Sequence, residues 1–388
     1  MDMISVDKAV RSCARNIVIT SNLSPGDGVI VSGGAHAQML LEEIALECYK
    51  KGATPTIVVS SDSYKERMYK ETSASNLARE PKQLIGLLKA SDMIIVVDEL
   101  DDPAVASRYP RNKIKAREKS MFQIQKLLSH PTKGKKWLFA GWPTRAAARH
   151  SHVSYSELRE IIVGGIAAPP NQLMRIGKQV DEGFGDASWA HVWDDNGTDF
   201  EVKIEGRRRY IDDGVISKMD FDTGDRGANL PAGELFCAPC ETVGSGTLYC
   251  PITRDRYSEK ILKDVHLEFR DGKLQLDSVT ASKNRDVLIS SFKQCLANDK
   301  EKYNPVRTLN LAELGIGFNP RIKRAIGYIL TDEKVTGTVH LAFGSNFGYG
   351  GNSRSWMHWD FVSAPGVNLE VERVDGEMVR VMEKGKFV

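Results

Sequence analysis

The sequence predicts an α/β N-terminal domain with a largely parallel sheet, followed by a β-rich α+β domain. Apolar runs of four to seven residues alternate with helical patterns over the first half of the chain, which is typical of parallel sheets covered by helices. Short strands separated by turns follow residue 198. At 388 residues the chain is longer than one ordinary core. We therefore expect two domains, residues 1–190 and residues 191–388.

Four apolar runs in the first domain predict buried strands. These runs are 28–32, 54–60, 93–97 and 137–140. Residues 35–51 carry apolar side chains at helical spacing and stop at Gly52, which favours a helix closed by a glycine. Residues 116–128 show a second helical pattern. Strands and helices thus alternate as in a parallel α/β sheet.

The pattern changes in the second half of the chain. Residues 154–184 read as mostly helical, with Pro169-Pro170 opening one segment at its first turn. Alternation of apolar and polar residues then predicts a series of short strands, at 200–204, 262–269, 273–279, 338–343 and 369–373. Asp271-Gly272 is a turn signal between two of them.

Composition excludes several classes of protein. Hydrophobic residues make up 41% and charged residues 27%, and the net charge is +2, which gives no argument for binding nucleic acid or an anionic membrane. No run reaches the apolar length of a membrane span, and the first residues lack the apolar core of a secretory signal. Six cysteines in a chain of this size do not predict a disulfide framework. We expect a cytoplasmic protein.

Two short motifs are interpreted as structural. Ser32-Gly33-Gly34 lies between a strand and a helix, but it lacks the spacing of a Rossmann fingerprint or a phosphate-binding loop. Cys237 and Cys240 form a lone CxxC without a second pair at zinc-finger spacing. A structural metal or a redox role is open for this pair, and reduced, partly buried thiols are the favoured interpretation.

The strongest functional signal is a set of imidazoles and acids in the second half. His358 and Asp360 are one residue apart, so on a strand both side chains would project from the same face. His340 lies near the end of another predicted strand. Glu234 and Glu313 stand among apolar residues and glycines, where an isolated anion would be costly to bury. A bound cation, a salt bridge or an exposed edge could each offset that cost.

Four segments in order, LPAGELF, NLAELGIGFNP, DEKVTGTVHLAFG and HWD, resemble the aminopeptidase T / aminopeptidase S family of dinuclear metallopeptidases. The resemblance covers most of the chain and is most specific in the second half, which it identifies as the metal-binding catalytic domain. The same superfamily includes 2,5-dihydroxypyridine dioxygenase. The resemblance further implies a homodimer that acts on a small molecule or a short peptide.

The resemblance also implies two divalent ions, Zn, Co or Mn, and a set of residues that hold them. Carried over position by position, the implied ligands are Glu234, Glu313, Glu333, His340, His358 and Asp360. Glu313 corresponds to a glutamate that can bridge the ions, and Glu313 and Glu234 are the candidates for shuttling a proton. The family's tyrosine after the first histidine corresponds to Tyr349, which stands at a different spacing here.

We therefore expect a metal-dependent hydrolase of the aminopeptidase T type, which cleaves an N-terminal peptide bond or a small amide with a metal-activated water. The alternative is a mononuclear non-haem Fe(II) dioxygenase that opens a dihydroxypyridine-like ring, with His340, His358 and Asp360 as its facial triad. The resemblance implies that the dioxygenases replace some of the acidic ligands of the dinuclear site. Both Glu234 and Glu313 are present in this chain, which favours the hydrolase. A metal-stabilised protein without turnover is a third reading, although a closed structural site usually has four ligands.

Overall fold

The structure is a computed structural model that describes residues 7–128, 134–224 and 226–388. The chain folds into two compact units that interleave in sequence. The first contains residues up to Pro170 together with Gly214–Pro231, and the second contains Asn171–Asp213 together with Ala232–Val388. The single boundary near residue 190 stays a prediction.

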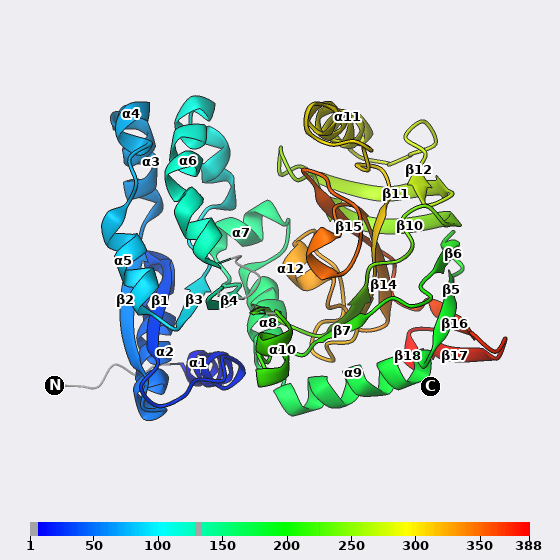
Figure 1. The fold of residues 1–388 in the computed structure, drawn as a ribbon, viewed down its shortest axis with the longest axis horizontal. Helices are drawn as coiled ribbons and strands as arrows, with labels where there is room; N and C mark the ends of the chain where they lie inside the picture. Colours follow the sequence, from blue (N-terminus) through cyan, green and yellow to red (C-terminus); the bar gives the residue numbers. More distant parts are fainter. Residues whose placement is uncertain (1–6, 129–133, 225) are drawn as a thin grey trace. The chain divides into compact units, whose positions relative to one another are not determined.

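The first unit is built around a five-stranded sheet (Figure 1). In spatial order its strands are β2 (Thr54–Ser60), β1 (Gly28–Gly34), β3 (Met93–Val97), β4 (Lys136–Ala140) and β8 (Gly227–Leu230). Every neighbouring pair is parallel. The expected α/β fold with a parallel sheet is thereby confirmed, and β8 is a strand that the sequence patterns did not predict.

Helices cover both faces of this sheet. The helices of the first unit are α1 (Lys8–Thr20), α2 (Gln38–Lys50), α3 (Asp62–Glu71), α4 (Ala74–Leu77), α5 (Lys82–Ala90), α6 (Arg111–Leu128), α7 (Arg145–His150), α8 (Tyr155–Ile166) and α10 (Lys218–Thr223). Ile30 of β1 packs with residues of α5 and α6. On the other face, Gly33 lies against Leu41 of α2. The helix expected at 116–128 starts earlier, at Arg111, and the one expected at 35–51 opens with a 3-10 turn, Ala35–Ala37.

The prediction that residues 54–60 form a buried strand is half wrong. The strand has the expected bounds, but none of its residues is buried, and Ile57 and Val59 are exposed. The reason is its position, because β2 is the edge strand of the sheet. An apolar run of this kind does not distinguish a central strand from an edge strand.

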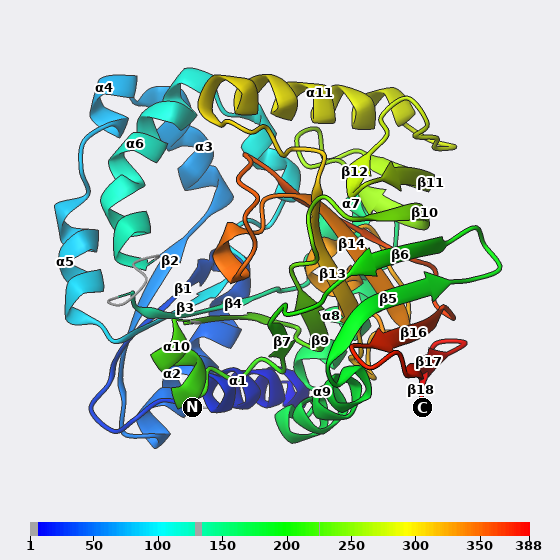
Figure 2. The same ribbon diagram turned by 45° about the vertical axis from the view of Figure 1, so that its right-hand side comes forward.

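The second unit contains two antiparallel sheets (Figure 2). The larger has the order β12 (Lys273–Leu274), β11 (Ile261–Arg270), β10 (Gly244–Arg254), β6 (Asp199–Lys203), β5 (Ala187–Trp193), β16 (Asn368–Arg373), β17 (Met378–Glu383) and β18 (Lys386–Phe387). The smaller has the order β15 (His358–Val362), β14 (Thr338–Gly344), β13 (Leu311–Gly317), β9 (Glu234–Cys237) and β7 (Arg209–Asp212). The β-rich second domain is thereby confirmed.

Three helices belong to the second unit. They are α9 (Pro170–Phe184), α11 (Arg285–Lys302) and α12 (Ile329–Asp332). On α11, Phe292 stacks on Trp359 of β15 with ring centroids 5.2 Å apart. The strand expected at 273–279 is wrong beyond Leu274, because a turn follows in which Ser278 N donates to Gln275 O.

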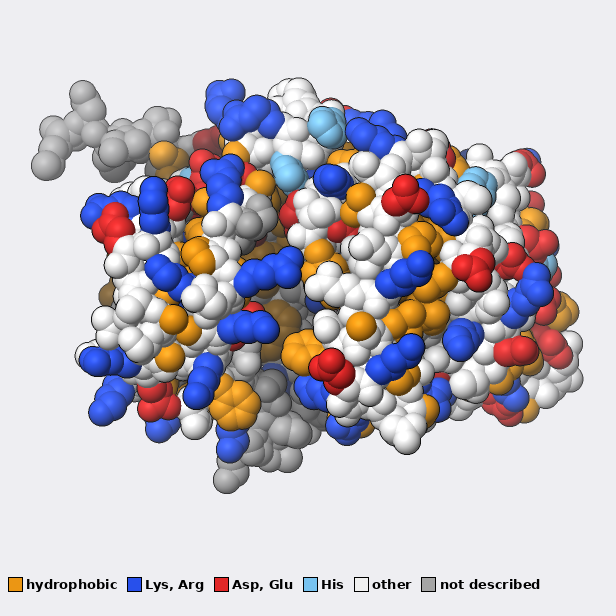
Figure 3. All heavy atoms as spheres, turned by 90° about the horizontal axis from the view of Figure 1, so that it is seen from above, with side chains coloured by type: hydrophobic (Ala, Val, Ile, Leu, Met, Phe, Trp, Pro, Cys, Tyr) orange, Lys and Arg blue, Asp and Glu red, His pale blue; other side chains and the backbone are white. Residues whose placement is uncertain are grey.

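Side chains of both charge signs cover the face drawn in Figure 3, which agrees with the small net charge. Among the described residues no helix combines the length and the apolarity that are needed to span a membrane.

Candidate metal centre

The candidate metal centre lies on one face of the smaller sheet of the second unit. Side chains of a strand alternate between its two faces. In β13, Glu313 therefore shares a face with the glycines at 315 and 317, while Leu314 and Ile316 point the other way. All residues of β13 and of its neighbour β14 are buried. One face of the strand is apolar core, and the other presents a carboxylate beside two positions without side chains.

On one side of its strand, each of four imidazoles and acids pairs with a very small residue. Across neighbouring strands the pairs are Glu234 with Gly317, His340 with Gly315, Asp360 with Ala342 and His358 with Gly344. A Cβ atom on Gly315 would lie 2.0 Å from Nε2 of His340. Glycine at this position therefore gives the imidazole the space that it occupies above β13.

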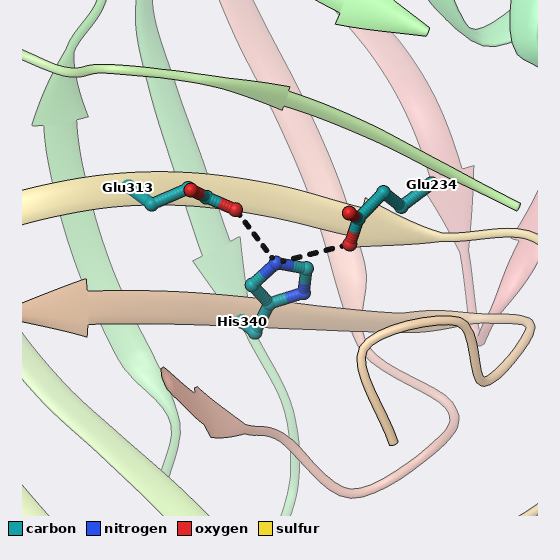
Figure 4. A group of neighbouring side chains, drawn as sticks. All are labelled: Glu234, Glu313 and His340. Carbon is teal, nitrogen blue, oxygen red and sulfur yellow. Dashed lines mark hydrogen bonds and ion pairs between the residues drawn. The ribbon is translucent and has the colours of Figure 1, made fainter. Parts of the chain in front are cut away.

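Two groups of side chains meet on this face. Glu234, Glu313 and His340 form the first (Figure 4), and Glu313, His358 and Asp360 form the second. Within each group the candidate ligand atoms lie within 4.8 Å of one another. Five of the residues predicted from the sequence are thus brought together, from four different strands, and Glu313 belongs to both groups.

Glu313 turns one carboxylate oxygen toward each histidine. Its Oε1 lies 3.2 Å from Nε2 of His340, and its Oε2 lies 3.5 Å from Nε2 of His358. Each imidazole also faces a second acid: Glu234 Oε2 is 3.5 Å from His340, and Asp360 Oδ1 is 3.1 Å from His358. This arrangement is that of a carboxylate that can bridge two cations.

The charges of the group shift the proton affinities of its members. Burial disfavours a charged imidazole, but Glu313 and Glu234 raise the pKa of His340 to about 9. Asp360 likewise overcomes burial and raises the pKa of His358 to about 10. Burial raises the pKa of Glu234 to about 8. Without a metal the site thus retains protons, which a bound cation would have to displace.

Two details fit a metal at this site. The Oε2 atom of Glu234 is buried and has no hydrogen-bond partner among the described residues, although buried carboxylate oxygens are normally satisfied. Nδ1 of His358 lies 2.8 Å from the carbonyl oxygen of Ser345. Because a carbonyl can only accept, Nδ1 carries a hydrogen, and Nε2, which faces Glu313 and Asp360, is the nitrogen that could bind a cation once its own proton is displaced.

Tyr349 reaches the site despite its unusual spacing in the sequence. It stands on the 3-10 turn Phe347–Tyr349, and its hydroxyl lies 3.3 Å from Nδ1 of His358 and 3.2 Å from the carbonyl oxygen of Ala312. Burial, and then the Glu313 carboxylate, raise its pKa. The phenol is therefore protonated at neutral pH, and in this structure it donates its hydrogen to the carbonyl oxygen of Ala312.

Glu241, which the sequence analysis missed, anchors the loop that carries Tyr349. Its buried carboxylate accepts hydrogen bonds from Nδ2 of Asn346, at 3.1 Å, and from the backbone N–H of Asn352. It also pairs with Arg207 at 2.9 Å. Nothing near Glu241 in the sequence marks it, because its partners lie more than a hundred residues further along the chain or belong to an arginine run.

Glu333 lies beside the two groups but belongs to neither of them. Its carboxylate pairs with Lys334 Nζ at 3.1 Å, and burial raises its pKa. Lys334 is itself buried and was not singled out in the sequence. A lysine next to a candidate acid reads as an ordinary surface pair, and only the fold shows that this one points inward.

The CxxC pair contributes no atom to either group. Cys237 and Cys240 are both free thiols, the first buried and the second half-buried. Burial raises the pKa of Cys237 to about 12, so this thiol is protonated and unreactive at neutral pH.

One family and two solved structures match nearly the whole chain. The family described as thermophilic metalloprotease (M29) matches residues 7–387. Wild-type AmpT from Thermus thermophilus is 18% identical, covers 98% of this chain and 99% of its own, and superposes with a TM-score of 0.74. 2,5-Dihydroxypyridine dioxygenase from Pseudomonas putida KT2440 is 16% identical, covers 99% of this chain and 98% of its own, and superposes with a TM-score of 0.60. No curated protein matches significantly.

At such low identities the two solved structures establish a shared fold, which extends over nearly the whole of each chain. The assignment to a family rests on the match over residues 7–387. The chain belongs to the thermophilic metalloprotease family M29, and it is accordingly a hydrolytic enzyme of the metal-dependent peptidase class.

Proposed function

We propose that this chain is a dinuclear hydrolase of the aminopeptidase T type, which cleaves an N-terminal peptide bond or a small amide. Glu234, Glu313 and His340 would hold one divalent ion, and Glu313, His358 and Asp360 would hold the other. The observation that carries this proposal is the position of Glu313, with one oxygen turned to each histidine. A carboxylate shared in this way is what a two-metal site requires.

The charge of the site also supports two ions. Glu234, Glu313 and Asp360 of the two groups and Glu333 beside them are four carboxylates, and Lys334 contributes one positive charge. With neutral imidazoles these described groups sum to a net charge of about minus three, which one divalent cation would not neutralise. A second divalent cation would offset the remainder.

The residues of the chain have distinct tasks in this proposal. When bound, ions of this kind lower the pKa of a coordinated water and polarise the amide carbonyl. Of the two candidates for moving a proton, Glu313 would use both of its oxygens in the bridge, so Glu234, which turns only Oε2 toward the first group, is the carboxylate that takes the proton of the attacking water and returns it to the leaving amine. The protonated hydroxyl of Tyr349, held beside His358, would turn its hydrogen from the Ala312 carbonyl to the oxygen on which negative charge develops.

The remaining parts of the proposal rest on the family resemblance. We expect Zn, Co or Mn as the ions, because carboxylates with two imidazoles suit all three. The substrate class is a short peptide or another small amide with a free amine, and the assembly is a homodimer. Glu333 is retained as an acidic residue beside the site, with no metal assigned to it.

The mononuclear Fe(II) dioxygenase is the second candidate, because the chain shares its fold with such an enzyme. Its facial triad would have to be His340, His358 and Asp360 on one ion. Among the described residues these three side chains do not form one group, since His340 belongs to the first group and the other two to the second. The geometry therefore favours the hydrolase.

The test is elemental analysis of protein purified under anaerobic conditions, followed by assays with aminoacyl amides and with dihydroxypyridines. About two ions of Zn, Mn or Co per chain, with release of an N-terminal residue, would support the proposal. One Fe per chain with oxygen consumption on a dihydroxypyridine would replace it by the dioxygenase. Unfolding on metal removal, without turnover of either substrate, would indicate a structural metal.

A further inference from the structure

Lys334 is a buried cation that the proposed chemistry does not use. Its side chain is 1% exposed, and its Nζ atom contacts three carboxylates. The partners are Oε1 of Glu234, Oε2 of Glu333 at 3.1 Å and Oδ2 of Asp212 at 3.3 Å. Three carboxylates therefore enclose one ammonium group in a buried part of the second unit.

Because of the contact with Lys334, the two carboxylate oxygens of Glu234 have different partners. Oε1 is occupied by the ammonium group, whereas Oε2 has no hydrogen-bond partner among the described residues and lies 3.5 Å from Nε2 of His340. The carboxylate is thus held in one orientation with a single oxygen turned toward the first group. Free rotation of Glu234 would present either oxygen, or both, to a cation.

Lys334 also allows two like charges to stand side by side. Asp212 and Glu234 are directly opposite each other on β7 and β9, a placement in which two carboxylates repel. The ammonium group contacts both of them. The backbone of Lys334 is fixed at both ends, because its N–H donates to the carbonyl oxygen of Thr331 and its carbonyl accepts from the N–H of Asn319. The cation is therefore held by the fold.

We propose that Lys334 is a positioning residue of the metal centre, which fixes Glu234 as a ligand through one oxygen and places an ammonium group between acids that stand side by side. Its ammonium group is enclosed by the three carboxylates, so it acts on the centre through Glu234. This inference rests on the proposed dinuclear site. If Lys334 positions Glu234, removing it weakens metal binding, whereas removing a lysine that only repels cations would strengthen it.

Co²⁺ titration of the metal-free protein separates the two effects. Its visible absorption reports the number and geometry of ligands, so the measurement does not depend on turnover. If Lys334 positions Glu234, Lys334→Met weakens one of two Co²⁺ ions by about 10- to 100-fold, the range seen for residues that orient metal ligands, and changes the spectrum of that ion. If the lysine is only a competing charge, its removal tightens Co²⁺ binding instead.

Three further variants complete the experiment. Lys293→Met removes an exposed lysine from α11 and should leave both Co²⁺ affinities unchanged. Asp212→Asn loosens Lys334 while leaving both groups complete. It should weaken the same ion by a smaller factor, about two- to fivefold, and it keeps the inference testable if Lys334→Met does not fold. Lys334→Arg, which retains the charge, should recover part of the loss.

The outcomes distinguish the inference from the function on which it rests. Wild-type protein that binds no Co²⁺, or one ion only, would contradict the dinuclear site itself. Wild-type protein that binds two ions, with unchanged or tighter binding in Lys334→Met and no change in Asp212→Asn, would overturn the role of Lys334 alone. Weaker binding of one ion in both variants, with Lys293→Met unaffected, is the expected result.

Discussion

Gly315→Ala should displace the imidazole of His340, because it adds one carbon atom at the point where this ring lies over strand β13. The new Cβ would lie 2.0 Å from Nε2 and 2.2 Å from Cε1 of His340, whereas ordinary contacts begin at 3.4 Å. The backbone of Gly315 does not have a positive φ, so alanine causes no conformational strain there. The whole effect of the substitution falls on the histidine ring.

The size of the effect follows from the burial of His340. Its side chain is fully buried, so the ring cannot retreat into solvent and must move by roughly 1 Å or more within a packed site. Overpacking of this kind costs about 1–3 kcal/mol of folding stability. A displacement of about 1 Å at a reacting centre can reduce the rate on the order of a hundredfold. We therefore expect a folded protein that has lost one ion and most of its activity.

Three measurements check this expectation: ions per chain after dialysis, the midpoint of thermal unfolding, and kcat/KM with an aminoacyl amide. Gly164→Ala in α8 is the control, because no atom lies within 4 Å of the Cβ that it adds. It should leave all three quantities unchanged or slightly raise stability. Wild-type metal content and activity in Gly315→Ala would refute the reasoning, since the ring would then have a second position compatible with ligation.

Three further predictions concern the ligands, the thiols and the response to pH. Glu313→Ala or His358→Ala should abolish turnover and loosen at least one ion, as elemental analysis would show, while the first unit stays folded by circular dichroism; full metal content with turnover in both variants would sink the ligand assignment. Cys237→Ser combined with Cys240→Ser should keep activity and metal, and loss of metal would mean that the thiols are ligands. Because the pKa values of the two site histidines are raised from 6.5 to about 9 and about 10, the stabilisation by their protonated forms is complete below about pH 6.5 and is lost as pH rises through 9 to 10. The thermal midpoint of metal-free protein should therefore fall over this range, and a midpoint independent of pH would contradict it.

The parallel sheet of the first unit could be predicted because its strands are apolar runs bounded by glycine and polar residues. Burial could not be predicted with the same certainty. Residues 54–60 form a strand as expected, but as an edge strand they remain accessible. Strand β8 was missed for a related reason. Gly227–Leu230 is short and weakly apolar, and its place in the sheet depends on β4, which lies almost ninety residues earlier in the chain.

The acids and imidazoles of the site were identifiable because they stand in motifs with a fixed order. Their supporting residues were not. Lys334 and Glu241 act through partners that are distant in sequence, and both types of residue are common on protein surfaces. Glu333 is a different case, since the family resemblance implied a ligand, and in the structure its carboxylate pairs with Lys334; its role as a ligand stays a prediction. Which neighbour an acid meets is decided by the register of strands, which a single sequence specifies only weakly.

The register also gives a physical reason for the small residues within the motifs. A metal site on a sheet face needs ligands from adjacent strands, yet side chains directly opposite each other stand only about 4.5–5.5 Å apart at Cβ. Ligands in every position would leave no space for ions between them. In this chain Gly315, Gly317, Ala342 and Gly344 occupy the positions opposite the ligands, so each imidazole or carboxylate extends over a gap. The glycines of AELGIG and HLAFG are thus as much part of the centre as the acids beside them, and replacing one should disturb metal binding without removing a ligand.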